Sequence, residues 1–286
     1  MKLSNDIITI EVAEHGAELV SLKKDGREYL WSGDAAYWNR HAPILFPAVG
    51  KTFNNELHVD GQVYPMKQHG FARDSEFEAI GDGRLCMKPS SLSESYPYRL
   101  GLEVCYCLNG NMVEVVWTVE NLDEKDAFFQ IGAHPGFMLP DYHADDATHG
   151  FIRYYDHEGN PVSPCMVSAL DDGNRVPRQI VNITDCMPIT ADTFAHDALM
   201  FEGSQVTKAV LCDKEGHEML GVNCQQAEAY GIWAPHKEGC PFVCLEPWCG
   251  ICDTKGFAGD ISARQYIHRL SPNGRYTFTY TIEVYR

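Results

Sequence analysis

Apolar and polar residues alternate with a period of two along much of the chain, and this pattern constrains the fold more than any other feature. It is clearest at residues 7–12, 102–108 and 276–285, which read IITIEV, LEVCYCL and YTFTYTIEVY. Successive side chains of a β-strand point to opposite faces, so the pattern predicts strands with one buried face and one more polar face. We expect a strand at each of these segments.

Short turn signals separate the predicted strands. They are KDG at 24–26, DG at 60–61, NGN at 109–111, DDGN at 171–174 and PNG at 272–274. Asn-Gly and Asp-Gly pairs between apolar runs are typical of β-hairpins. Helical periodicity is confined to two short candidates, at residues 34–38 and 192–196. The sequence therefore predicts a nearly all-β, antiparallel, meandering architecture.

The length and composition favour a single globular unit. The chain has 286 residues, of which 44% are hydrophobic, and large all-β sandwiches reach this size as one domain. We found no internal repeat and no Pro/Ser-rich linker, and the polar segment 141–150 is too short to divide the chain. We expect one domain spanning residues 1–286.

The charge and the cysteines narrow the possible partners. A formal net charge of -17 without a basic stripe argues against nucleic acid and against an anionic membrane surface. The first residues lack an apolar signal segment, and 11 cysteines are an odd number, which favours free thiols in a reducing compartment. We expect a cytoplasmic monomer or homodimer that acts on a small molecule.

Five segments interrupt the strand pattern with polar or cyclic residues, and such local conflicts concentrate at functional sites. These segments are NRHAPILFP at 39–47, QHGFAR at 68–73, GAHPGF at 132–137, HDALMF at 196–201 and FVCLEPW at 242–248.

Glu246 follows an apolar run and precedes Pro247, so we expect it to end a strand on a largely dry face. Burial raises the pKa of a carboxyl group towards the working pH, where a general base is most effective. The alternative is a structural ion pair with an arginine. The sequence alone leaves both interpretations open.

His134 lies between an apolar run and Pro135-Gly136, at the predicted edge of a strand. A histidine in this position is often an ordinary loop residue, but beside Glu246 it would supply the complementary acid. His69, Arg40 and Arg73 offer hydrogen-bond donors for hydroxyl groups or a ring oxygen.

Some of these residues also have purely structural interpretations. Either arginine, Arg40 or Arg73, could instead pair with a carboxylate such as Asp74 or Glu76. Trp233 could stack on the apolar face of a sugar ring or belong to the core.

Four cysteines near Glu246 raise the question of a metal site. Their spacing is C-x3-C-x4-C-x2-C, which ends in a CxxC motif, but one of them lies inside the predicted strand and the first pair lacks turn residues. The histidines do not form an HExxH motif. We therefore predict neither a metal nor a cofactor. The four residues are Cys240, Cys244, Cys249 and Cys252.

The same segments resemble the aldose 1-epimerase family, also called galactose mutarotases, and most closely its LacX-like bacterial branch. The resemblance covers nearly the whole chain. It rests on the order and spacing of ITIEVAEHGAELVSLKKDGREYLWSG at 8–33, NRHAPILFPAVG at 39–50, HGFAR, AHPGF and FVCLEPW.

This resemblance implies a large antiparallel β-sandwich with a sugar bound in an open cleft on one sheet face. It places the family's catalytic base at Glu246, its catalytic acid at His134 and a second sugar-binding histidine at His69. The family's sugar-binding aspartate matches Asp197, next to His196.

One departure concerns the substrate. The galactose mutarotase branch carries Arg-x-x-Asn-Arg after a glycine, whereas here KTFNN follows Gly50. Arg40 or Arg73 could take over the missing hydrogen bonds. The preferred sugar is therefore left open.

The implied reaction is acid–base ring opening of a free aldose. Glu246 takes the C1 hydroxyl proton while protonated His134 donates to the ring oxygen, and reversal after rotation gives the other anomer. One rival is a hexose-6-phosphate 1-epimerase, which would use Arg40, Arg73 or Lys51 for the phosphate. A second rival is a non-catalytic sugar-binding protein. A glycoside hydrolase fits less well, because most use two carboxylates.

Overall fold

The computed structural model describes residues 1–81, 83–87 and 96–286, and nearly all regular structure in them is β-strand. The paired strands of each sheet run antiparallel, which confirms the predicted fold class. The described helices are three single turns of 3-10 helix, η1 (Phe53–Asn55), η2 (Ala72–Asp74) and η4 (Ile261–Ala263).

The largest sheet has nine strands in the order β18-β15-β20-β21-β25-β11-β10-β9-β8. Their bounds are β8 (Phe77–Gly81), β9 (Arg84–Met87), β10 (Leu100–Asn109), β11 (Met112–Asn121), β15 (Phe151–Tyr155), β18 (Cys186–Pro188), β20 (Lys208–Cys212), β21 (Glu218–Asn223) and β25 (Arg275–Val284).

Two sheets form the opposite layer. The six-stranded sheet has the order β19-β22-β23-β13-β5, with β14 also on β23, and the four-stranded sheet has the order β1-β2-β3-β4. Their bounds are β5 (Ile44–Leu45), β13 (Ile131–Ala133), β14 (Gly136–Met138), β19 (Leu199–Glu202), β22 (Ala229–Trp233), β23 (Phe242–Cys249), β1 (Lys2–Ser4), β2 (Ile8–Val12), β3 (Leu19–Lys24) and β4 (Arg27–Glu28).

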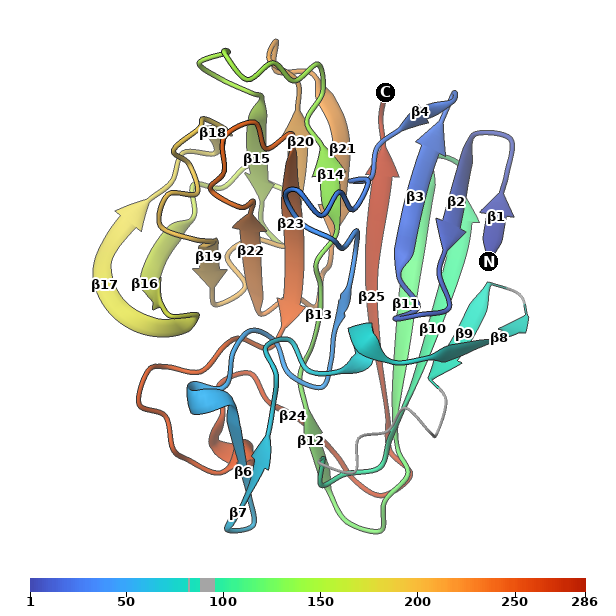
Figure 1. Ribbon diagram of the computed structural model, residues 1–286, viewed down its shortest axis with the longest axis vertical. Coiled ribbons are helices and arrows are strands. Elements are labelled where there is room, and N and C mark those ends of the chain that lie inside the picture. Colours follow the sequence, from blue (N-terminus) through green and yellow to red (C-terminus); the bar gives the residue numbers. More distant parts are fainter. Residues whose placement is uncertain (82, 88–95) are drawn as a thin grey trace.

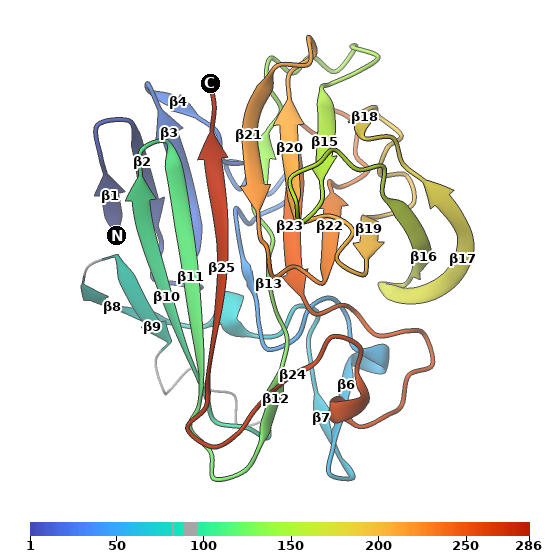
Figure 2. The same cartoon turned by 180° about the vertical axis from the view of Figure 1, so that it is seen from behind.

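Three two-stranded sheets lie at the periphery. They are β6 (Glu56–Val59) with β7 (Gln62–Pro65), β12 (Ala127–Phe129) with β24 (His268–Leu270), and the hairpin of β16 (Cys165–Asp171) and β17 (Asn174–Asn182). In Figure 1 the nine-stranded sheet lies behind the six- and four-stranded sheets, and Figure 2 shows the same β-sandwich from the other side, with the nine-stranded sheet in front. Both views show the β16–β17 hairpin curving away on one side. The largest hydrophobic cluster joins residues from Ile8 to Val284.

The alternation predicted from sequence is present in the strands that suggested it. β2 alternates strictly between buried and half-buried residues, and β11 does so over ten residues. In β11 and β25 the inward positions Trp117 and Phe278 are cross-strand partners, and their rings stack at 5.1 Å. Such cross-strand pairs stabilise a sheet beyond backbone hydrogen bonding.

Four of the five predicted turn signals join paired strands, whereas PNG at 272–274 lies between β24 and β25, which do not pair with each other. Asp25-Gly26, Asp60-Gly61 and Asp172-Gly173 each join two paired strands and have positive φ at both residues. This is the geometry for which Asp-Gly is preferred.

The two short helices expected from sequence are wrong. Residues 34–38 and 192–196 form turns. In the first, Asp34 O accepts the N–H groups of Tyr37 at 3.0 Å and Trp38 at 2.9 Å, and the bonding goes no further. A single turn gains too few hydrogen bonds to offset the cost of helix nucleation, so tertiary contacts decide its shape.

The part of the chain that the structure describes contains no helix with the length and hydropathy of a membrane span.

Candidate active site

A cavity of about 390 Å³ opens on the face of the six-stranded sheet that points away from the main core. Strand β23 shows how this face is built. Val243, Leu245 and Cys249 pack into the main core, whereas the intervening Glu246 and Trp248 line the cavity. The lining residues are Trp38, Gly50, Gln68, His69, Arg73, His134, Leu170, Gly173, Asp197, Ala198, Met200, Trp233, Glu246, Trp248 and Cys252.

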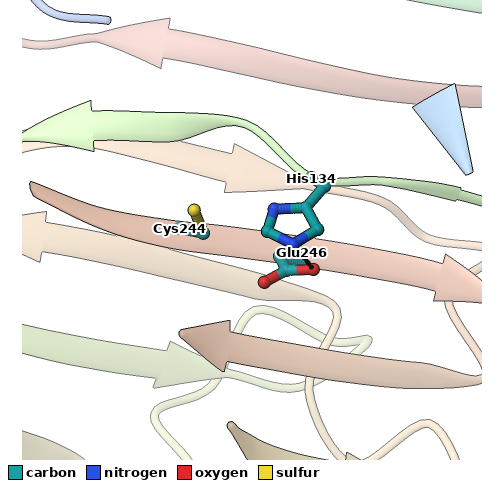
Figure 3. Close-up of side chains that lie close together, drawn as sticks. All are labelled: His134, Cys244 and Glu246. Atoms are coloured by element: carbon teal, nitrogen blue, oxygen red, sulfur yellow. Dashed lines mark ion pairs between the residues drawn. The ribbon is translucent and has the colours of Figure 1, made fainter. Parts of the chain in front are cut away.

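The sheet register places His134 directly opposite Glu246. Gly132 pairs with Trp248 on one side of this position, and Gly136 pairs with Cys244 on the other. Directly opposed residues of antiparallel strands project from the same face. His134 Nε2 accordingly lies 3.3 Å from Glu246 Oε2, as Figure 3 shows.

Two prolines interrupt the ladder at this point. Leu245 N–H donates to Pro135 O at 3.1 Å, but Pro135 has no N–H to return, and Pro247, two residues along, also lacks one. The segment opposite β23 is therefore split into β13 and β14, with His134 in the gap. The prediction that the strand ends at Glu246 is wrong, because β23 continues to Cys249 and pairs with β22 as far as Trp248.

Both members of the pair are buried, with 7% of His134 and 1% of Glu246 exposed. His134 Nδ1 and Glu246 Oε2 have no hydrogen-bond partner, and the 3.3 Å contact lacks hydrogen-bond geometry. Burial raises the pKa of Glu246 well above its usual value and lowers the pKa of His134 to about 3. The expected protonated His134 is therefore disfavoured, because burial favours the neutral pair.

Aromatic rings fix the orientation of His134. Trp38 stacks on its imidazole at 4.8 Å, and the edges of Trp233 and His69 approach at 5.5 Å and 5.6 Å. Trp38 was not among the predicted site residues. It follows a turn, and no strand pattern in the sequence indicated that this turn would meet the sheet.

Trp248 occupies a slot made by two glycines on the neighbouring strands. A Cβ at Gly132 would lie 2.7 Å from its Cδ1, and one at Gly231 would lie 2.4 Å from its Cζ2. Because Gly231 is the cross-strand partner of Glu246, the indole lies beside the carboxyl group. Trp248 Nε1 is buried without a hydrogen-bond partner. Trp248 was not among the predicted site residues, although glycines within neighbouring strands indicate that a large side chain packs against them.

His69 is held in one tautomer by the backbone. Its Nδ1 accepts the N–H of Gly50 at 3.1 Å, so the proton of the neutral ring lies on Nε2. Burial lowers the pKa of His69 well below its usual value, with the neighbouring His134 as a further cause. His69 therefore lines the cavity as a neutral donor.

The two arginines proposed from sequence have different environments. Arg73 lines the cavity, donates from one terminal nitrogen to Gln68 O at 2.7 Å and keeps a buried Nε without a partner. Arg40 does not line the cavity. It binds Asp74 at 2.7 Å and Arg73 O at 3.3 Å, which matches the structural alternative considered for it.

Asp197 lines the cavity, whereas its neighbour His196 does not. Lys51, which stands where the family arginines begin, ion-pairs with Asp172 at 2.7 Å and contributes nothing to the lining. Trp233 lines the cavity next to His134 and also packs against the cluster of Trp31, Phe242 and Cys244, so both interpretations left open for it remain. The structure thus brings together all the predicted site residues except Arg40.

The tip of the β16–β17 hairpin forms one wall of the cavity through Leu170 and Gly173. A buried guanidinium anchors this tip. Arg175 donates to Cys252 O at 2.9 Å, to Glu202 at 2.7 Å and to the side chain of Gln265 at 2.8 Å. The sequence offered no pattern that marked this hairpin as part of the site.

The four clustered cysteines do not share a site. Strand alternation places Cys249 in the main core and Cys244 in a separate aromatic cluster, and Cys252 belongs to a third cluster. Every cysteine in the chain is a free thiol. The CxxC spacing therefore has no metal-binding geometry of its own.

Comparison with known proteins identifies the family. The model of the aldose 1-epimerase family matches residues 1–283. The plasmid and chromosomal LacX proteins of Lactococcus lactis subsp. lactis are each 30% identical over 272 residues, which cover 88% of both chains.

Solved structures give the same result. A galactose mutarotase related enzyme from Lactobacillus acidophilus is 26% identical, with a TM-score of 0.87 over 100% of this chain and 97% of that one. A galactose mutarotase-like protein from Lactobacillus casei is 27% identical, with a TM-score of 0.86 over 100% and 99%. The fold is thus that of the galactose mutarotase-like proteins. The chain belongs to the aldose 1-epimerase family, a family of carbohydrate epimerases.

Proposed function

We propose that the protein interconverts the α and β anomers of a free aldohexose, with Glu246 and His134 as its acid–base pair. The observation that carries this proposal is that two buried groups, Glu246 and His134, lie 3.3 Å apart on the wall of a cavity. Burial shifts their pKa values in opposite directions. Cavities that hold a proton donor and acceptor with perturbed pKa values are candidate catalytic sites.

Ring opening needs two proton transfers of opposite direction. Glu246 takes the proton of the C1 hydroxyl and His134 gives a proton to the ring oxygen, while the C1–O5 bond breaks and an aldehyde forms. Rotation about C1–C2 and the reverse transfers close the ring as the other anomer. Protons balance, because the pair carries one proton before and after each step.

The burial of the pair fits this cycle. Ring opening consumes the charged form, with ionised Glu246 and protonated His134, and leaves the neutral form, which ring closure then uses. Burial favours the neutral form, with protonated Glu246 and unprotonated His134. One proton shift across the 3.3 Å contact converts it into the form that opens a ring.

The remaining lining residues would position the sugar. Neutral His69 and the free Nε of Arg73 are donors, the Asp197 carboxylate is an acceptor, and Trp233 offers an apolar face. Holding the ring hydroxyls against the pair lowers the entropic part of the barrier.

The charges support an unphosphorylated substrate. Of the three cations considered for a phosphate, Arg40 is paired with Asp74 and Lys51 with Asp172, and only Arg73 lines the cavity. The Asp197 carboxylate lies on the same lining and would repel a phosphate. Comparing turnover of glucose with that of glucose 6-phosphate tests this assignment directly.

The proposal is tested by following freshly dissolved single anomers by NMR or polarimetry. Glu246→Gln and His134→Asn are each expected to reduce the rate by about 100-fold or more, as for loss of a general acid or base. A Glu246→Gln protein that turns over its sugar at the wild-type rate would exclude the proposed mechanism. Sugar binding without anomerisation by the wild type would instead identify a binding protein.

A further inference from the structure

A cluster of potential metal ligands lies outside the cavity, where three strands meet. Glu228 precedes β22, Cys249 ends β23 and His268 begins β24. A carboxylate oxygen, the thiol sulfur and an imidazole nitrogen of these residues all lie within 4.8 Å of one another.

Two of the three ligand atoms are buried and unsatisfied. Glu228 Oε2 and His268 Nε2 lie 3.3 Å apart but do not hydrogen-bond, and neither has another hydrogen-bond partner. Buried polar atoms in folded proteins are nearly always paired. A cation between them would satisfy both atoms at once.

The surrounding side chains hold the ligands in place. The His268 ring packs against Tyr276 at 4.7 Å and Phe129 at 5.6 Å. The Tyr276 hydroxyl donates to Cys249 Sγ at 3.6 Å and would stabilise a thiolate. Outer partners of this kind orient metal ligands and tune their basicity.

We propose that Glu228, Cys249 and His268 bind a divalent transition metal, for which Zn²⁺ is the best match. Thiolate sulfur, imidazole nitrogen and carboxylate oxygen are each established zinc ligands. The side chains of Glu228 and His268 are 30% and 19% exposed, so the site is close enough to solvent for an ion to enter.

The position of the site indicates a structural role. Among the described strands, β24 pairs only with β12, whereas β22 and β23 are central strands of the six-stranded sheet. A metal held by all three segments would join the peripheral β12–β24 pair to that sheet. The site does not depend on the proposed epimerase activity, because none of its ligands lines the cavity.

Metal binding would exchange a proton for the ion. Without metal, the Cys249 thiol carries a proton, which it donates to Gln226 O at 2.9 Å. On binding, the S–H bond breaks, the S–metal bond forms and the proton passes to solvent, with no change of oxidation state.

The test is titration of the chelator-treated full-length protein with Zn²⁺ by calorimetry, together with Co²⁺ spectra and melting curves. We expect one ion per chain, a thiolate-to-cobalt charge-transfer band and a melting temperature that rises with Zn²⁺ concentration. Cys249→Ala should abolish the charge-transfer band. Cys249→Ala and Glu228→Gln should each weaken Zn²⁺ binding by more than about 100-fold, because loss of a residue that only hydrogen-bonds to a metal ligand already costs about 10–100-fold.

Matched variants separate the possible results. Cys212→Ala removes a buried thiol in β20, away from the site, and should bind Zn²⁺ like the wild type. Absence of binding by the wild type would overturn the proposal, and so would binding that Glu228→Gln leaves unchanged. Binding lost in Cys244→Ala but retained in Cys249→Ala would also overturn it, because the ion would then lie beside His134 and Glu246. Glu228→Gln alters a partly exposed side chain and keeps the test valid if Cys249→Ala does not fold.

Discussion

His134 Nε2 and Glu246 Oε2 lie 3.3 Å apart at directly opposed positions of adjacent strand segments, and both residues are buried. Two prolines, Pro135 and Pro247, keep the backbone between these segments from pairing fully. The pair therefore faces the cavity with unsatisfied polar atoms that a sugar could engage. Unsatisfied groups of this kind are common at functional sites.

The pH dependence of anomerisation should be bell-shaped with widely separated limbs. Activity needs one proton on the pair, so it should rise as pH increases through the lower pKa and fall as pH increases through the upper one. Burial lowers the pKa of His134 to about 3 and raises that of Glu246 well above its usual value. Rates are measured between about pH 4 and pH 9, and the rate with Glu246→Gln is subtracted at each pH as the background. The corrected rates should show no acid limb near the ordinary histidine pKa of about 6.5. An acid limb at that value would contradict the neutral pair.

Glu246→Gln should become more stable relative to the wild type as pH rises. The folded-state pKa of Glu246 lies above its unfolded value, so its contribution to stability is complete below the unfolded pKa and is lost as pH rises through the folded pKa. The glutamine cannot ionise. The difference in unfolding free energy between Glu246→Gln and the wild type should widen by up to about 1.4 kcal/mol per pH unit between the unfolded and the folded pKa of Glu246. Urea denaturation at several pH values measures it, and a constant difference would refute the assignment.

Gly231→Ala should reduce activity by displacing Trp248 from beside Glu246. The added Cβ would lie 2.4 Å from the indole, and a displacement of about 1 Å in an active site can cost about 100-fold in rate. Gly101→Ala in β10 is the control, because its Cβ would make only ordinary contacts from 3.5 Å outwards. Steady-state kinetics of both variants decide the point. Equal activity in the two would show that the slot is not needed.

Arg175→Met should destabilise the protein by about 3–5 kcal/mol, because it leaves the buried carboxylate of Glu202 unpaired. The double variant Arg175→Met/Glu202→Gln should recover part of this loss. Arg269→Met breaks a more exposed ion pair with Asp126 and should cost less than about 1 kcal/mol. Chemical denaturation compares the three. A cost for Arg175→Met no larger than that of Arg269→Met would show that Arg175 does not anchor the hairpin.

Much of the fold could be predicted because its signals are local. Alternation at residues 7–12, 102–108 and 276–285 predicted β2, β10 and β25 to within two residues at each end. Asp-Gly pairs identified three hairpin turns. The helix predictions at 34–38 and 192–196 were wrong, since segments this short take the shape that their tertiary contacts impose.

The site was predicted only in part. Motif order identified Glu246 and His134, but Arg40 proved to be bound to Asp74, and Trp38 and Trp248 were missed. These three outcomes depend on which segments the fold brings together. A single sequence carries no direct record of such contacts.

The sequence by itself determined the strand pattern, the hairpin turns and the membership in the family, because each depends on residue types at fixed spacing along the chain. Only the tertiary structure decided that His134 faces Glu246 at 3.3 Å, that Trp248 lies in a glycine slot and that Cys249 meets Glu228 and His268. These relationships come from sheet register and packing between distant segments. Burial then sets the protonation of His134 and Glu246, and burial is a property of the folded chain alone.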